Sequence, residues 1–91
     1  MKLTAFILSS CPYCLQASEL IEELYAEHPE FSGIGIDYID EAKEPELAER
    51  YDYYRVPSFF SGEEKLYEAD PRWCRAEAKR RLEEMFVSLV S

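Results

Sequence analysis

The feature that most constrains this sequence is an apolar run that leads directly into a pair of closely spaced cysteines. Residues 3–8, Leu-Thr-Ala-Phe-Ile-Leu, are nearly continuous in apolar character, and two serines separate them from Cys11-Pro12-Tyr13-Cys14. A short run of this kind, bounded by polar residues, is typical of a strand that is buried on both faces of a sheet. The sequence therefore predicts a buried strand that ends just before two thiols.

A helix is predicted directly after the first cysteine. Its apolar side chains recur at the spacing of one helix face, while acidic side chains occupy the other face; the inner set is Ala17, Leu20, Ile21, Leu24 and Tyr25. Cys14 lies three positions before Ala17 and extends this inner set, whereas Cys11 falls at the mouth of the helix. The helix ends at His28-Pro29, because the residue before a proline disfavours helical backbone.

The rest of the chain alternates between short strands and helices. Ile34, Ile36, Tyr38 and Ile39 predict a second buried strand. Pro45 opens a short helix, and residues 58–61 and 65–68 form an antiparallel pair around a turn at Gly62. Asp70 and Pro71 predict the start of a last helix, as N-cap and first helical residue. Cys74 shares a stripe with Ala78, Leu82, Met85 and Leu89, so a core position is the more favoured interpretation and a regulatory thiol the alternative.

These elements predict one α/β domain over residues 1–91. Their order is β-α-β-α-β-β-α, and the strand–helix–strand start favours a right-handed parallel crossover. We expect a four-stranded mixed sheet with helices on both faces.

Charge and composition limit the partners that we expect. The net charge is −9, from 10 basic and 19 acidic residues, which disfavours nucleic acid and anionic membrane surfaces as partners. The first apolar run is shorter than the roughly 7–15 residues of an export signal core, and no run approaches the ~20 residues of a membrane span. Three cysteines are too few for a disulfide-stapled scaffold. We therefore expect a cytoplasmic monomer.

The spacing of the thiols favours redox chemistry over metal binding. The thiolate is the nucleophilic form of cysteine, and the N–H groups and dipole at a helix N-terminus stabilise that anion. Two intervening residues let Cys14 reach back across one turn and resolve a mixed disulfide formed at Cys11. Zinc needs about four ligands, and the further ligands considered, His28 and Cys74, lie far away in the sequence. No metal site is predicted.

With the thiols placed between a strand and a helix, the chain resembles the thioredoxin and glutaredoxin superfamily over nearly its whole length. Cys11-Pro12-Tyr13-Cys14 is identical to the active-site tetrad typical of dithiol glutaredoxins. Arg55-Val56-Pro57-Ser58 resembles the family's Val-Pro-Thr/Ser element, which lies against the active-site cysteines.

The resemblance implies a thioredoxin-like fold and a role for each of these residues. Cys11 is then the nucleophile and Cys14 the resolving thiol. Pro12 stiffens the first helical turn and Tyr13 borders the site. Pro57 is cis, so that the backbone of Val56 can pair with an extended substrate or with glutathione.

The expected glutathione contacts differ from the glutaredoxin pattern. Leu8 stands where glutaredoxins commonly carry a lysine, and Glu68-Ala69 stands where they carry Gly-Gly. Two charged residues are candidate replacements in substrate binding: Arg55 for a carboxylate and Asp70 for an ammonium group. The alternatives are a solvated loop charge for Arg55 and a plain helix N-cap for Asp70.

The sequence thus predicts a thiol–disulfide oxidoreductase that binds no cofactor and reduces protein or glutathione mixed disulfides, with glutathione as a candidate co-substrate. One alternative is a dedicated protein reductant fed by a thioredoxin-type reductase, which the departures at Leu8 and Glu68-Ala69 favour. Another is a module that holds an iron–sulfur cluster between two chains through Cys11 and glutathione. Pro12 and Cys14 argue against that module.

Overall fold

The computed structural model describes residues 2–90 and has the predicted element order. The strands are β1 (Lys2–Ile7), β2 (Gly35–Asp40), β3 (Ser58–Ser61) and β4 (Glu64–Glu68). The helices are α1 (Pro12–Glu27), α2 (Pro45–Ala48) and α3 (Arg75–Val90), and a 3₁₀ turn, η1 (Pro29–Gly33), follows α1. Within residues 2–90, none of the helices combines the length and the apolar character that a membrane crossing needs.

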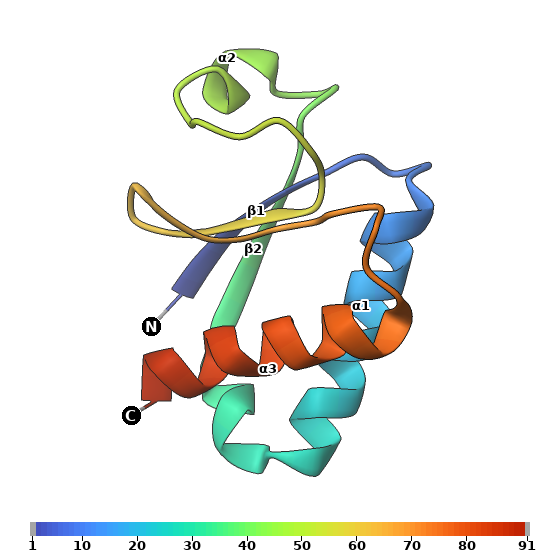
Figure 1. The fold of residues 1–91 in the computed structure, drawn as a ribbon. Helices are drawn as coiled ribbons and strands as arrows, with labels where there is room; N and C mark the ends of the chain where they lie inside the picture. Colours follow the sequence, from blue (N-terminus) through green and yellow to red (C-terminus); the bar gives the residue numbers. More distant parts are fainter. Residues whose placement is uncertain (1, 91) are drawn as a thin grey trace.

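The four strands form one mixed sheet in the order β2-β1-β3-β4 (Figure 1). β1 runs parallel to β2 and antiparallel to β3, and β3 runs antiparallel to β4. β1 is therefore a central strand with a neighbour on each side, which explains why its sequence is nearly continuous in apolar residues. The predicted α/β class and mixed sheet are confirmed.

Different layers cover the two faces of the sheet. α1 and α3 lie on one face, and α2 lies on the other (Figure 1). Successive side chains of a strand point to opposite faces, so Leu3 and Ala5 join the larger core under α1 and α3. Phe6 joins a smaller core with Ile39 and Phe60, and that core is closed by the side chains of α2 and the loop after it.

The prediction that the second strand is buried is wrong. β2 forms an edge of the sheet, and within it only Ile39 is buried, while Tyr38 is 44% exposed. The reason is the strand order, since a strand at the edge lies where the covering layers end. A local pattern of isoleucines does not contain that information.

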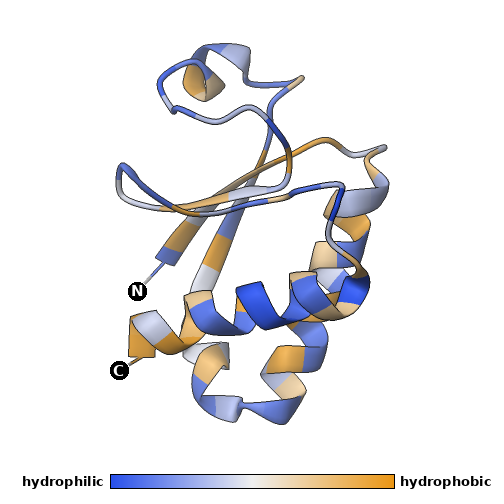
Figure 2. Ribbon diagram, in the orientation of Figure 1, coloured by the Kyte–Doolittle hydropathy of each residue, from blue (hydrophilic) through white to orange (hydrophobic). Residues whose placement is uncertain are grey.

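The predicted start of the last helix is also wrong. α3 begins at Arg75, and the carbonyl of Cys74 accepts the N–H of Ala78 at 3.0 Å. The carboxylate of Asp70 instead accepts the N–H of Arg72 at 2.9 Å and closes a tight turn. Figure 2 shows that hydrophilic residues predominate in this turn and in the first half of α3. Cys74 lies before the first helical turn, so it is exposed and does not belong to the core as predicted.

Candidate active site

β1 and α1 together hold the two thiols at one end of the sheet. Cys11 immediately precedes α1 with an extended backbone, φ −85° and ψ 120°. Its carbonyl accepts the N–H groups of Cys14 at 3.1 Å and Leu15 at 3.2 Å, which starts the helix. Pro12 fits the first helical position because the N–H that it lacks would have no partner inside the helix.

The two thiols have different surroundings. Cys11 is partly exposed, and its Sγ lies 3.9 Å from the carbonyl oxygen of Val56. Cys14 is buried one turn into α1, where its Sγ accepts the N–H of Leu8 at 3.5 Å. Burial raises the pKa of Cys14 to about 12, against the opposing effect of the Leu8 hydrogen bond and with a further contribution from the Cys11 sulfur. Cys14 is therefore a protonated thiol at neutral pH.

We expect iodoacetamide at pH 8 to modify Cys11 and Cys74 in the folded, reduced protein and to leave Cys14 intact. A raised pKa keeps Cys14 in the unreactive thiol form until the pH approaches 12, and burial limits access to its sulfur. Peptide mapping by mass spectrometry after a timed reaction measures the three sites separately. In urea all three cysteines should react alike, and modification of Cys14 as fast as Cys74 in the folded protein would contradict this account.

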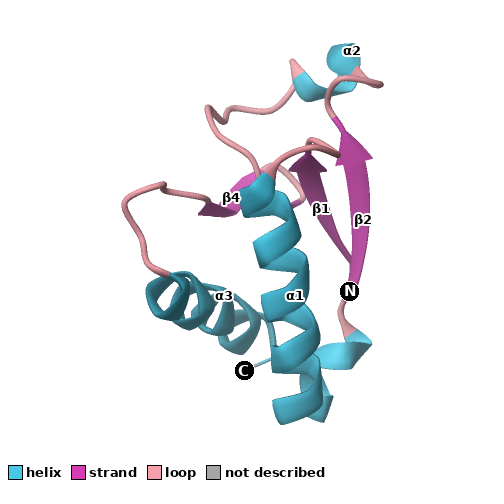
Figure 3. Ribbon diagram, turned by 90° about the vertical axis from the view of Figure 1, so that its right-hand side faces the viewer, coloured by secondary structure: helices cyan, strands magenta, loops and turns pink. Residues whose placement is uncertain are grey.

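The loop before β3 lies next to Cys11. In Figure 3 the connection that follows α2 descends past the N-terminal end of α1. The Val56–Pro57 peptide bond in this connection is cis. Pro57 and Ser58 are buried, and the Ser58 hydroxyl donates to the carbonyl of Arg55 at 2.5 Å. The structure thus brings Val56 and Pro57 beside Cys11.

A groove of about 290 Å³ lies at this end of the sheet. It is lined by Leu8, Tyr13, Glu41, Tyr54, Arg55, Val56, Ala69 and Pro71. The rings of Tyr13 and Tyr54 are 45% and 87% exposed, so the groove offers apolar and aromatic surface to a partner.

The sequence did not predict Glu41 or Pro71 as groove residues, whereas the family resemblance had already placed Ala69, with Glu68, at the expected substrate contacts. Glu41 directly follows β2, and the carboxyl ends of the parallel strands β1 and β2 meet at the same edge, which is the signal that could have placed it. Its carboxylate accepts the Tyr53 hydroxyl at 2.9 Å. Pro71 carried no comparable signal, because its position depends on where β4 ends.

Several solved structures have a similar fold. The match with the germline-specific thioredoxin Deadhead of Drosophila melanogaster covers 98% of this chain and 80% of the Deadhead chain, at 23% identity and a TM-score of 0.65. The chain has a thioredoxin-like fold. The match with the zinc-bound form of human ERp44 covers 99% of this chain and 26% of the ERp44 chain, at 17% identity and a TM-score of 0.58. The match with a malarial protein covers 92% of this chain and 94% of the malarial protein's chain, at 15% identity and a TM-score of 0.58.

At these identities the similarity concerns the fold. No protein-family model matches the sequence. A search of curated proteins likewise finds no significant match.

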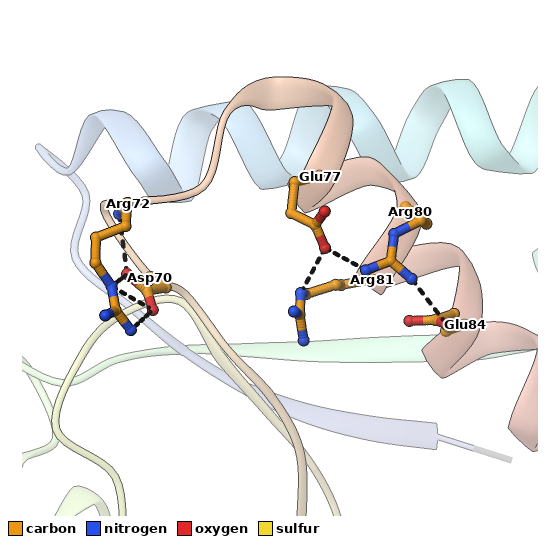
Figure 4. Close-up of polar contacts among 6 residues, drawn as sticks. All are labelled: Asp70, Arg72, Glu77, Arg80, Arg81 and Glu84. Carbon is orange, nitrogen blue, oxygen red and sulfur yellow. Dashed lines mark hydrogen bonds and ion pairs between the residues drawn. The ribbon is translucent and has the colours of Figure 1, made fainter.

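In this thioredoxin-like fold the charged candidates Arg55 and Asp70 lie close to each other, and Arg55 lines the groove whereas Asp70 does not. Asp70 already has a partner, because its carboxylate accepts Nε and Nη2 of Arg72 at 3.0 and 2.7 Å (Figure 4). Nη1 of Arg55 lies 3.9 Å from the same carboxylate. The Arg72 guanidinium holds the pKa of Asp70 well below its usual range. A substrate ammonium group would therefore have to displace an arginine.

Within residues 2–90 no group of three His, Cys, Asp or Glu side chains gathers where it could share a metal ion. His28 follows the C-terminal end of α1, where its Nε2 lies 2.8 Å from the Glu83 carboxylate. It is thus at the opposite end of α1 from Cys11.

Proposed function

We propose that the protein is a thiol–disulfide oxidoreductase in which Cys11 attacks the substrate and Cys14 resolves the intermediate. The observation that carries the proposal is the difference between the two thiols. Cys11 is accessible at the N-terminus of α1 and faces the Val56 carbonyl, whereas Cys14 is buried one turn behind it. A helix N-terminus stabilises the thiolate that attacks.

The proposed reaction consists of two thiol–disulfide exchanges. The Cys11 thiolate attacks one sulfur of the substrate disulfide and bonds to it, and the other substrate sulfur leaves as a thiolate that takes up a proton. Cys14 then loses its proton to solvent and attacks Cys11 Sγ, which releases the remaining substrate thiolate. The substrate gains two electrons and the protein retains a Cys11–Cys14 disulfide. An external dithiol then returns two electrons by two further exchanges and is itself oxidised to a disulfide.

The surroundings of Cys14 fit its place as the second reactant. Its pKa is raised by burial and, in addition, by the nearby Cys11 sulfur. Once Cys11 is bonded to a substrate sulfur it no longer has a thiol that can ionise beside Cys14 or share a proton with it, so this second contribution is lost. Cys14 therefore becomes easier to deprotonate at the step that requires its thiolate.

Protein disulfides are the substrates that the groove supports best. Apolar and aromatic side chains dominate its lining, and Leu8 forms part of the wall. The carboxylate of Asp70, the candidate for a substrate ammonium group, is bonded to Arg72. These contacts favour a protein reductant fed by a thioredoxin-type reductase over an enzyme specific for glutathione.

The test is a pair of coupled assays with insulin as the protein disulfide. We expect the protein to reduce insulin at least about tenfold faster than dithiothreitol alone, since the thiolate is the nucleophile and a helix N-terminus favours it. We expect NADPH with thioredoxin reductase to sustain turnover better than glutathione with glutathione reductase. Insulin reduction no faster than with dithiothreitol alone would refute the proposed function. Turnover with the glutathione system only would refute the preference for a thioredoxin-type reductase.

A further inference from the structure

The strand end at Glu68-Ala69 holds the loop that carries Val56. Oε2 of Glu68 accepts the backbone N–H groups of Tyr54 at 2.5 Å and Arg55 at 2.7 Å. One residue further on, the N–H of Ala69 donates to the carbonyl of Pro57 at 3.0 Å. The backbone on both sides of Val56 is therefore tied to the end of β4.

The carboxylate of Glu68 is well suited to this contact. Its other oxygen, Oε1, accepts Nζ of Lys65 at 2.8 Å, so both oxygens are engaged. Burial raises the pKa of Glu68, but the bonds from Lys65 and from the two N–H groups outweigh burial and bring it below its ordinary value. Hydrogen bonds to an ionised acceptor are about twice as strong as neutral ones. The side chain thus holds the loop as an anion at neutral pH.

The loop that Glu68 holds forms one wall of the groove. Tyr54, Arg55 and Val56 all line it, and the carbonyl oxygen of Val56 lies 3.9 Å from Cys11 Sγ. Glu68 itself does not line this groove, and its carboxylate binds Lys65 and the backbone N–H groups of Tyr54 and Arg55. A change at Glu68 would therefore move the wall of the groove while leaving both thiols in place.

We propose that Glu68 is a positioning residue for disulfide exchange, which fixes the backbone of residues 54–56 so that Val56 and the exposed ring of Tyr54 are presented to an incoming protein chain. This inference rests on the proposed function and adds to it a residue that acts on substrate binding. The N–H groups of Tyr54 and Arg55 are engaged by Glu68 and are not free to pair with a substrate, so the proposal assigns backbone pairing to Val56.

The test compares Glu68→Ala with Glu68→Gln, whose amide oxygen can still accept an N–H. Glu64→Ala is the matched control, since Glu64 is exposed, lies on the same strand and carries the same charge. Three quantities are measured for each variant: KM and kcat for insulin reduction, the rate of Cys11 alkylation by iodoacetamide, and the amide hydrogen exchange of Tyr54 and Arg55 by NMR.

For Glu68→Ala we expect KM to rise about tenfold and the two amides to exchange at least about tenfold faster, as the loss of charge-assisted hydrogen bonds implies. We expect kcat and Cys11 alkylation to stay within about twofold, because the thiols are untouched. Glu68→Gln should keep KM within about threefold of the wild type, since it keeps an acceptor. Glu64→Ala should match the wild type in all three measurements.

An unchanged KM in Glu68→Ala would overturn the proposal. A fall in kcat and in Cys11 alkylation together with the rise in KM would also overturn it, because that pattern indicates general loss of structure. If the wild type does not reduce insulin, the proposed function fails and amide exchange alone decides whether Glu68 holds the loop. Unchanged exchange of Tyr54 and Arg55 in Glu68→Ala would then overturn the inference.

Discussion

Cys11→Ser is expected to abolish disulfide reduction, whereas Cys14→Ser is expected to stop the reaction at a mixed disulfide. Without Cys11 the accessible thiol at the helix N-terminus is gone, and the buried Cys14, with its pKa raised to about 12, cannot replace it. Without Cys14 the first exchange still occurs, but no internal thiol releases the substrate. Insulin reduction rates and mass spectrometry of the trapped adduct measure the two effects.

The control for this pair is Cys74→Ala. Cys74 is exposed and lies outside the groove, so we expect its loss to leave insulin reduction within about threefold, as for a surface substitution remote from the site. Equal residual activity in Cys11→Ser and Cys14→Ser would contradict the assignment of attacking and resolving roles. Loss of activity in Cys74→Ala would show that a third thiol takes part.

Phe6→Ala is expected to lower the free energy of unfolding by about 3–5 kcal/mol, the range for deleting a buried phenylalanine side chain. Phe6 is fully buried on the face of β1 opposite α1. Its ring centroid lies 4.7 Å from that of Tyr51, 5.0 Å from that of Tyr53 and 5.9 Å from that of Phe60. A domain of this size has only about 5–15 kcal/mol of stability in total, so the loss is a large share of it.

Urea denaturation followed by circular dichroism measures this loss. Val87→Ala is the matched control, because Val87 is a partly exposed apolar residue on α3 at 47% exposure. Val87→Ala should change the free energy of unfolding by no more than about 0.5 kcal/mol, as surface substitutions usually do. A cost of less than about 1 kcal/mol for Phe6→Ala would mean that the small core under α2 contributes little to stability, contrary to the packing of its four aromatic rings.

The elements that local sequence patterns predict correctly are β1 and α1. The apolar run of residues 3–8 required a central strand, and the structure places it there as β1. The helical spacing from Cys14 to Leu24 and the position of Pro12 determined α1 and put Cys11 at its start. These features follow from backbone sterics and from the burial of one helix face, both of which depend on residues close together in the chain.

The features that the sequence did not predict depend on contacts between segments that are far apart in the chain. The strand order put β2 at the edge and exposed Tyr38, although its isoleucines resemble those of a buried strand. Asp70 has the sequence of a helix cap, but in the structure it begins a tight turn in which its carboxylate accepts the N–H and the guanidinium of Arg72. Cys74 therefore lies outside the core.

The role of Glu68 at the site likewise could not be predicted from the sequence. From the sequence Glu68-Ala69 is only a departure from Gly-Gly. In the fold, Glu68 reaches the backbone of Tyr54 and Arg55, more than a dozen residues earlier, and thereby holds Val56 beside Cys11. Hydrophobic periodicity determines which segments form strands and helices, whereas a carboxylate finds its N–H partners only after the sheet has brought β4 and the loop before β3 together.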